Sequence, residues 1–165
     1  MEEDMKKIIF VSISFVAIFI FTQVNALACS CPTVGTMYPT TGNVSDYLIE
    51  EQVRNAKVVF SGEVVGINKI PKTRMLLVKI EVKESWKEIL PKEITITTEL
   101  GGCGYHFQVG SEYLIFANGS DNENLSTGEC LRNKLLYKAT EELQILGEGS
   151  QPQKSKSKIF KNNSL

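Results

Sequence analysis

Apolar and polar side chains alternate over much of the middle of the chain, with the two-residue period of β-strands. Residues 75–86 and 93–100 show this pattern, because charged or threonine side chains separate successive apolar ones. Residues 57–67 predict a long strand that Gly62 and Gly66 interrupt, as expected where a strand bends or bulges. Residues 112–117 predict a short, almost wholly apolar strand, and a last short strand is expected near residues 125–130.

Helical patterns flank these strands. Residues 45–55 predict a helix in which Ser45 is suited to the N-cap position. Its apolar face consists of Leu48, Ile49 and Val53. Residues 139–146 predict a second helix that ends at Gly147. Five short strands, one or two short flanking helices and no internal repeat predict a mainly β, single-domain protein whose strands close into a small barrel.

The first 28 residues have the organisation of an export signal. Two lysines precede an uncharged apolar run at residues 8–21, and Ala26-Leu27-Ala28 is a small-x-small cleavage pattern. Cleavage after Ala28 would leave Cys29 as the first residue of a secreted, extracellular protein. A permanent membrane anchor is disfavoured, because the apolar run is shorter than the roughly 20 residues that span a bilayer. A lipoprotein is also disfavoured, because Ala26 stands where such signals usually have a large aliphatic residue.

The chain after the signal divides into one domain, residues 29–149, and a tail, residues 150–165. The tail contains no acidic residue and four basic ones, namely Lys154, Lys156, Lys158 and Lys161. This composition is typical of a solvated, disordered tail, with binding to an anionic surface as the alternative. The whole chain has 18 basic and 19 acidic residues, which excludes a chain-wide basic field for nucleic acid. We expect no nucleic-acid partner, no membrane association after signal cleavage, and a monomer.

Histidine occurs once, as His106, so a multi-histidine metal centre is excluded. A hydrolase has little support, because His106 is the only base available to a serine or cysteine nucleophile. Alone and two residues after a glycine, His106 is more simply a surface or packing residue. Trp86, at the end of an alternating strand, is most simply a side chain that covers the core. We therefore predict a binding protein with no cofactor of its own, and not an enzyme.

Four cysteines are the most informative residues, and Cys29 and Cys31 form a C-x-C pair. Four cysteines allow three pairings, and a bridge between Cys29 and Cys31 would be strained. Two pairings remain open: each of these residues bonds either Cys103 or Cys130. Each bridge would stabilise the fold by on the order of 4 kcal/mol. The alternative, a four-cysteine zinc site, is disfavoured by export and by the absence of C-x2-C knuckles.

The cysteines stand in a recognisable sequence frame. A signal that ends at Cys-x-Cys is followed by Asn55-Ala-Lys-Val-Val-Phe-Ser-Gly-Glu-Val-Val, by Gly-Gly-Cys-Gly104, and by Thr127-Gly-Glu-Cys130. From Cys29 to Leu146 the chain resembles the N-terminal, netrin-like domain of tissue inhibitors of metalloproteinases. The resemblance implies a five-stranded OB-fold barrel, secretion, and the pairing Cys29–Cys103 with Cys31–Cys130. It also implies that the partner is a zinc metalloendopeptidase.

In that family the mature N-terminal cysteine is the inhibitory element, so the resemblance assigns Cys29 as a chelator of the target's catalytic zinc. Its α-amine and carbonyl oxygen would take the open position that such a zinc offers. By the same resemblance Ser30 would enter the specificity pocket beside the zinc, and Cys31, Pro32 and Thr33 would continue along the cleft. The remaining protease-contacting residues would be Gly101, Gly102 and Gly104, beside Cys103. The alternative function is a non-inhibitory netrin-like module that binds an extracellular protein or glycan.

Overall fold

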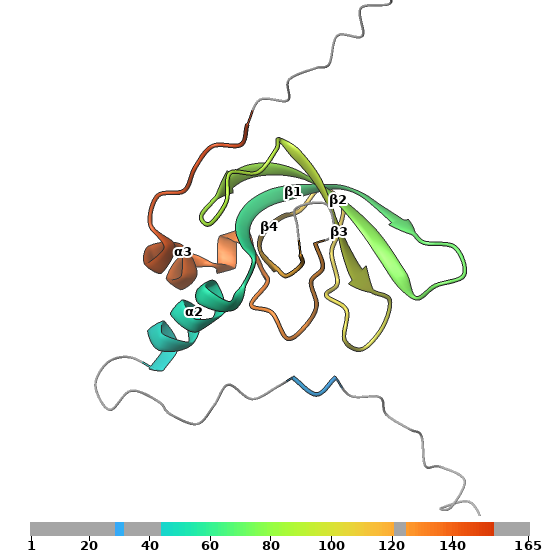
Figure 1. Cartoon of the computed structure of the whole chain (residues 1–165), viewed down its shortest axis with the longest axis horizontal. Coiled ribbons are helices and arrows are strands. Elements are labelled where there is room, and N and C mark those ends of the chain that lie inside the picture. Colours follow the sequence, from blue (N-terminus) through green and yellow to red (C-terminus); the bar gives the residue numbers. More distant parts are fainter. Residues whose placement is uncertain (1–28, 32–43, 121–124, 154–165) are drawn as a thin grey trace, which may run out of the picture.

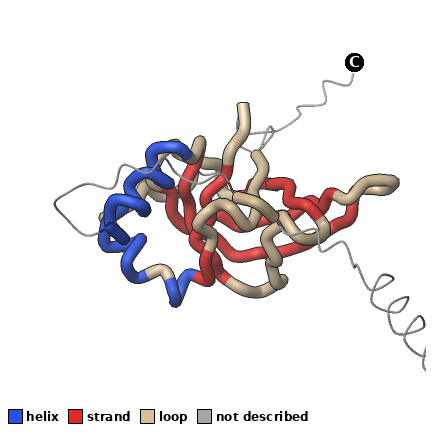
Figure 2. The backbone as a smooth tube through the Cα atoms, turned by 90° about the horizontal axis from the view of Figure 1, so that it is seen from below, coloured by secondary structure: helices blue, strands red, loops and turns tan. Residues whose placement is uncertain are grey.

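The computed structural model describes residues 29–31, 44–120 and 125–153. Within these residues the protein is mainly β, with one five-stranded antiparallel sheet in the order β3-β2-β1-β4-β5. The strands are β1 Val58–Lys69, β2 Met75–Ser85, β3 Glu93–Glu99, β4 Glu112–Ala117 and β5 Lys134–Leu135. The helices are α2 Val44–Asn55, the 3-10 turn η1 Leu136–Lys138, and α3 Thr140–Leu146. The sheet is strongly curved, and α2 and α3 lie together on one side of it (Figures 1 and 2).

The first four predicted strands are confirmed to within two residues at each end. In β1 the register against β2 shifts between Ser61 and Gly62 and again between Val64 and Gly66, as the two glycines predicted. At Gly62 the close approach of β2 requires a glycine, because a β-carbon would lie 2.6 Å from Ile80 Cγ2 and 2.7 Å from the Glu81 carbonyl oxygen. The bends let a single long strand curve along the sheet.

Two apolar clusters lie on opposite faces of the sheet. The larger contains side chains from β1 to β4, among them Phe60, Ile80, Ile96 and Ile115. The smaller lies between the sheet and the helices and includes Val59, Leu114, Phe116 and Ala139. Strands β1 and β4 therefore bury both faces, which explains why residues 112–117 do not alternate. Trp86 packs on the smaller cluster, in agreement with its expected role as a side chain that covers the core. Its indole N–H donates to the Gly147 carbonyl at 2.9 Å.

The predicted closure into a barrel is not present in the described part of the chain, where β3 and β5 are the edges of an open sheet. The predicted strand at 125–130 is also wrong. Ser126 makes only isolated bridges, to Thr97 of β3 and to Asn118 after β4, and the paired segment β5 comes later. The physical reason is a turn at Gly128, whose carbonyl accepts from the Leu131 N–H at 3.1 Å. A chain that turns there cannot continue a ladder along β3.

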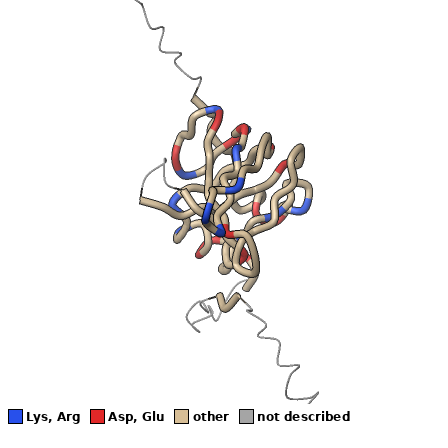
Figure 3. Tube along the Cα trace, turned by 90° about the vertical axis from the view of Figure 1, so that its right-hand side faces the viewer, with Lys and Arg blue, Asp and Glu red and all other residues tan. Residues whose placement is uncertain are grey.

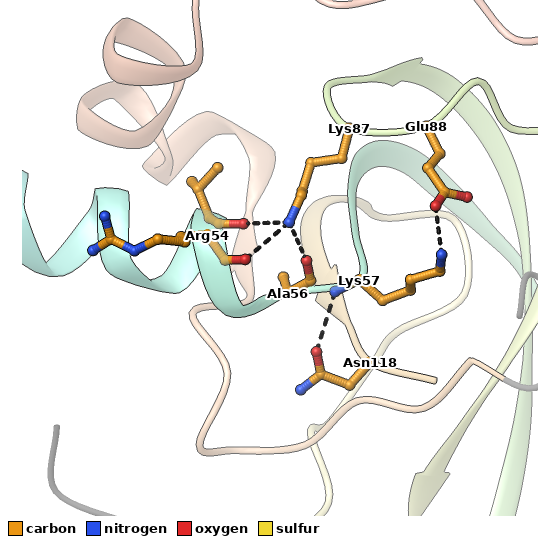
Figure 4. A network of polar contacts seen from close by, with 7 residues as sticks. Arg54, Ala56, Lys57, Lys87, Glu88 and Asn118 are labelled. Carbon is orange, nitrogen blue, oxygen red and sulfur yellow. Dashed lines mark hydrogen bonds and ion pairs between the residues drawn. The ribbon is translucent and has the colours of Figure 1, made fainter. Parts of the chain in front are cut away.

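Both predicted helices are present. Helix α2 begins at Val44, so Ser45 is not its N-cap; the Ser45 hydroxyl instead donates to the Glu141 carboxylate of α3 at 3.4 Å. Lys87, in the connection after β2, donates from Nζ to the carbonyls of Val53 at 2.9 Å, Arg54 at 3.0 Å and Ala56 (Figure 4). This ammonium satisfies carbonyls that a helix C-terminus leaves free and complements its dipole. Helix α3 ends before Gly147, as predicted.

The chain remains in contact with the sheet beyond the predicted domain boundary at 149. The Ser150 N–H donates to the Ser85 carbonyl at 2.7 Å, and the Gln153 N–H donates to the Leu90 carbonyl at 2.9 Å. The predicted signal, residues 1–28, and the lysine-rich part of the predicted tail, residues 154–165, lie outside the described residues. Within the described ranges, no helix is long and apolar enough to cross a membrane. Basic and acidic residues are interspersed along this part of the chain (Figure 3).

Candidate functional site

The four cysteines form two neighbouring disulfides. Cys29 bonds Cys103 and Cys31 bonds Cys130, with Cα–Cα distances of 4.9 and 5.2 Å. This is the pairing that the family resemblance implies, and not the crossed one. The Sγ atoms of Cys29, Cys31 and Cys130 lie within 4.8 Å of one another, but none is a free thiol. The four-cysteine zinc alternative therefore has no thiolate ligands in this structure.

The two bonds fix the short segment Cys29-Ser30-Cys31 against the body. Cys29 is half-buried, whereas Ser30 and Cys31 are exposed. Ser30 therefore lies between two covalent anchors with its side chain at the surface. Pro32 and Thr33, which the family resemblance also assigned to the contact surface, lie outside the described residues.

A tight turn at Gly101–Gly104 supports Cys103. The Gly104 N–H donates to the Gly101 carbonyl at 3.0 Å, and Gly101 has φ +132°, a conformation that favours glycine. A β-carbon on Gly104 would overlap the Glu99 carbonyl oxygen, so only glycine fits there. Of the three glycines that the family resemblance assigned to a protease contact, Gly102 is exposed, Gly101 half-buried and Gly104 buried. Gly104 thus shapes the turn rather than presenting a surface.

The side chain of Arg74, beside the turn between β1 and β2, covers this glycine turn. Its Nη2 donates to the Leu100 carbonyl at 3.1 Å, and the Leu100 N–H donates to the Arg74 carbonyl at 2.6 Å. A β-carbon on Gly101 would lie 2.5 Å from Arg74 Nη2. The absence of a side chain at Gly101 therefore leaves room for the guanidinium, which packs against the turn.

A buried polar network that no sequence pattern predicted positions Cys130. The Asn133 side chain accepts from the Phe116 N–H at 2.9 Å and donates to Thr127 Oγ1 at 2.8 Å and to the Gly128 carbonyl at 3.1 Å. The Thr127 hydroxyl donates in turn to the Phe116 carbonyl at 2.7 Å. These bonds attach the turn that carries Cys130 to β4. No sequence signal marks Asn133, because its partners are 5 to 17 residues away.

The aromatic residues near the site belong to the core. Tyr105, Phe107 and Tyr113 pack edge to face, with centroid distances of 4.8, 5.0 and 6.0 Å. Burial, followed by the charges of Tyr113 and Glu129, raises the pKa of Tyr105, so its hydroxyl stays protonated. His106 is exposed, and its Nδ1 lies 3.8 Å from Glu129 Oε1. This position agrees with its interpretation as a surface residue.

A hollow of about 530 Å³ opens beside the disulfides. One wall is the C-terminal half of α2, and the other includes Asn118 and the 126–131 segment. Cys29, Cys103 and Cys130 contribute to its lining. The hollow therefore adjoins the segment that the two disulfides fix.

Comparison of the chain with protein-family models finds no match, and comparison with curated proteins finds none either. The candidate function therefore depends on the residues and geometry of the site.

Proposed function

We propose that the protein is a secreted inhibitor of zinc metalloendopeptidases, and that its inhibitory element is Cys29 once the signal has been removed. The observation that carries the proposal is the disulfide-anchored segment Cys29-Ser30-Cys31, held beside the Gly101–Gly104 turn with Ser30 exposed. The finer fold assignment, a netrin-like OB-fold, is part of the same proposal. It is supported by the five-stranded order and by the bridges of Ser126 to both β3 and the end of β4.

Cleavage after Ala28 would give Cys29 a free α-amine next to its own carbonyl oxygen. These two atoms close a five-membered ring on a metal ion. A catalytic protease zinc has three protein ligands and one position for water, so bidentate ligation displaces the water that would attack a peptide bond. The protein needs no metal of its own for this mechanism, because the zinc belongs to the target.

The two disulfides would make this mechanism effective. An unstructured N-terminus would lose conformational freedom on entering an active-site cleft, and that loss would weaken binding. Cys29 and Cys31 are already tied to Cys103 and Cys130. The Cys103 carbonyl accepts from the Glu129 N–H at 3.0 Å, and the Leu131 N–H, next to Cys130, donates to the Gly128 carbonyl. The segment can therefore bind with little further ordering, and Ser30 is free to enter a pocket of the target.

The decisive experiment compares three forms of the processed protein: native, carbamylated at the α-amine, and extended by one alanine before Cys29. We expect the two modified forms to lose inhibition of a panel of zinc metalloendopeptidases by at least about 100-fold, because a metal ligand is lost and bulk replaces it. Circular dichroism should show the same fold for all three. Equal inhibition by the alanine-extended form would reject the chelating mechanism and favour the non-inhibitory module that binds an extracellular protein or glycan.

A further inference from the structure

The hollow beside the disulfides has the composition of a cation site. Among its described lining residues Glu51 is the only charged side chain. Helix α2 also contributes the carboxamides of Gln52 and Asn55, and Asn118 contributes a third from the facing wall. Carboxylate and amide oxygens accept hydrogen bonds from ammonium and guanidinium groups. No lysine, arginine or histidine is among those lining residues.

The carboxylate of Glu51 has no partner within the described residues. Its Oε2 is shielded from solvent and accepts no hydrogen bond, and no ion pair there involves Glu51. A shielded carboxylate oxygen without a donor is costly, so such a group calls for a specific explanation. Glu51 differs in this respect from Glu142, the other acidic residue with a shielded oxygen, because Glu142 binds two cations.

The basic residues on α2 and against its C-terminal end are not available to Glu51. Lys57 pairs with Glu88 at 2.6 Å, and Lys87 is bound to the last carbonyls of α2 (Figure 4). Arg54, three residues along the helix, is exposed and forms no described ion pair with Glu51. Segments 32–43 and 121–124, which adjoin residues near the hollow in sequence but are not described, contain no lysine, arginine or histidine. Processing would give Cys29, which also lines the hollow, an α-ammonium, but the proposed function assigns that amine to the target's zinc. Once it is bound there, a cation for Glu51 must come from elsewhere.

We propose that this hollow receives a lysine or arginine side chain of the partner protein, with Glu51 as the counter-ion and the three carboxamides as further acceptors. The inference rests on the proposed function, because it is the binding of Cys29 to a target that would bring a partner surface against the adjoining hollow. The hollow would then discriminate between targets: those with a basic residue at this place bind more tightly than those without. The Glu51 contact would add a side-chain interaction to an inhibitory element that binds mainly through the backbone atoms of Cys29.

The first test uses small probes and does not depend on inhibition. N-acetyl-arginine methylamide and its neutral analogue N-acetyl-citrulline methylamide are titrated into the processed, isotope-labelled protein by NMR. We expect saturable shifts at Asn55, Asn118 and Ser126 with the arginine probe only. Glu51→Gln should abolish them, whereas Glu50→Gln, an equal charge change on the exposed side of the same helix, should retain them. Shifts with neither probe, or shifts that survive Glu51→Gln, would overturn the proposal.

The second test identifies the occupant. Glu51→Gln should weaken inhibition of susceptible proteases by about tenfold at low salt and less at high salt, with less than about twofold change for Glu50→Gln. Arginine binding together with unchanged inhibition by Glu51→Gln would overturn the partner assignment. The partner assignment would also be overturned if arginine bound more tightly after replacement of Lys154, Lys156, Lys158 and Lys161 by glutamine. That result would mean that the chain's own tail occupies the hollow. Arginine binding by a protein that inhibits no protease would reject the proposed function, and with it the partner assignment, while the cation site itself would remain.

Discussion

Two regions of the molecule are held together by different means. At the cysteine site, disulfides fix the segment Cys29–Cys31 to Cys103 and Cys130, and a backbone hydrogen bond closes the Gly101–Gly104 turn. On the helical side, α2 and α3 are held by the smaller apolar cluster, by Lys87, and by the buried Glu142. The difference reflects the side chains that each region can use for packing. A surface made of glycine, serine and cystine offers few side chains for packing, so disulfides supply its rigidity.

This comparison predicts that the cysteine site is the more sensitive to loss of covalent bonds. Replacing Cys31 and Cys130 together by serine should lower the free energy of unfolding by about 4–5 kcal/mol, because the bond closes a loop of 99 residues. Chemical denaturation of the exported protein measures the effect. The native protein under reducing conditions is the control and should lose at least as much. An unchanged midpoint would contradict the assigned pairing.

A matched pair of glycine substitutions tests whether backbone geometry shapes the same region. Gly104→Ala should destabilise by about 3 kcal/mol or more, because the added carbon overlaps the Glu99 carbonyl oxygen. Gly102→Ala, two residues earlier in an exposed position, should change the stability by less than about 0.5 kcal/mol. Equal melting temperatures for the two variants would show that the turn can rearrange, and that Gly104 does not determine its shape.

The helical side should instead be sensitive to pH. Burial alone would raise the pKa of Glu142, but hydrogen bonds from Lys134 and Arg132, at 2.6 and 2.8 Å, lower it below its ordinary value of 4.5. A lowered folded-state pKa means that the carboxylate stabilises the fold above that ordinary value and loses this contribution as pH falls through the lowered pKa. Glu142→Gln should therefore lower the free energy of unfolding by about 2–3 kcal/mol at pH 7 and by progressively less below about pH 4.

The control for this variant is Glu141→Gln, which removes the neighbouring exposed carboxylate and should cost less than about 0.5 kcal/mol. Urea denaturation from pH 3 to pH 7 measures both. If the loss of stability in Glu142→Gln did not change with pH, the shape of this side chain and not its charge would explain its burial.

Local patterns in the sequence predicted most of the sheet. Residues 75–86 and 93–100 alternate because one face of each strand is buried. The glycines in 57–67 mark places where the strand bends or another strand approaches closely. Both patterns are visible along the chain. The last strand was misplaced, because Leu125, Ser126 and Thr127 have the composition of a strand. The turn that ends it at Gly128 is held by the Asn133 side chain, which no local pattern marks. Ser45 was misassigned for a similar reason, since its hydroxyl partner lies 96 residues away.

The site was predictable where covalent chemistry defines it. The C-x-C spacing excluded a bridge between neighbours, but only the family resemblance selected one of the two remaining pairings. The roles of Asn133, Glu142 and Arg74 were not predictable, because each contacts residues that are ordinary in type and stand in no recognisable motif with it. Glu51 has no feature in the sequence that separates it from Glu50, and only the structure distinguishes a shielded carboxylate from an exposed one.

The pairing of Gln153 with the start of β3 has a practical consequence for attaching the molecule to a support. Gln153 lies beside Leu90 and Pro91, just before β3, whereas the glycine turn bonded to Cys29 follows directly after its end. The seven residues of β3 separate these two points by about 20 Å along the strand. A tether joined after Gln153 therefore leaves the body at the opposite end of β3 from the cysteine site. The protein can be immobilised through its C-terminal side with Ser30 still accessible.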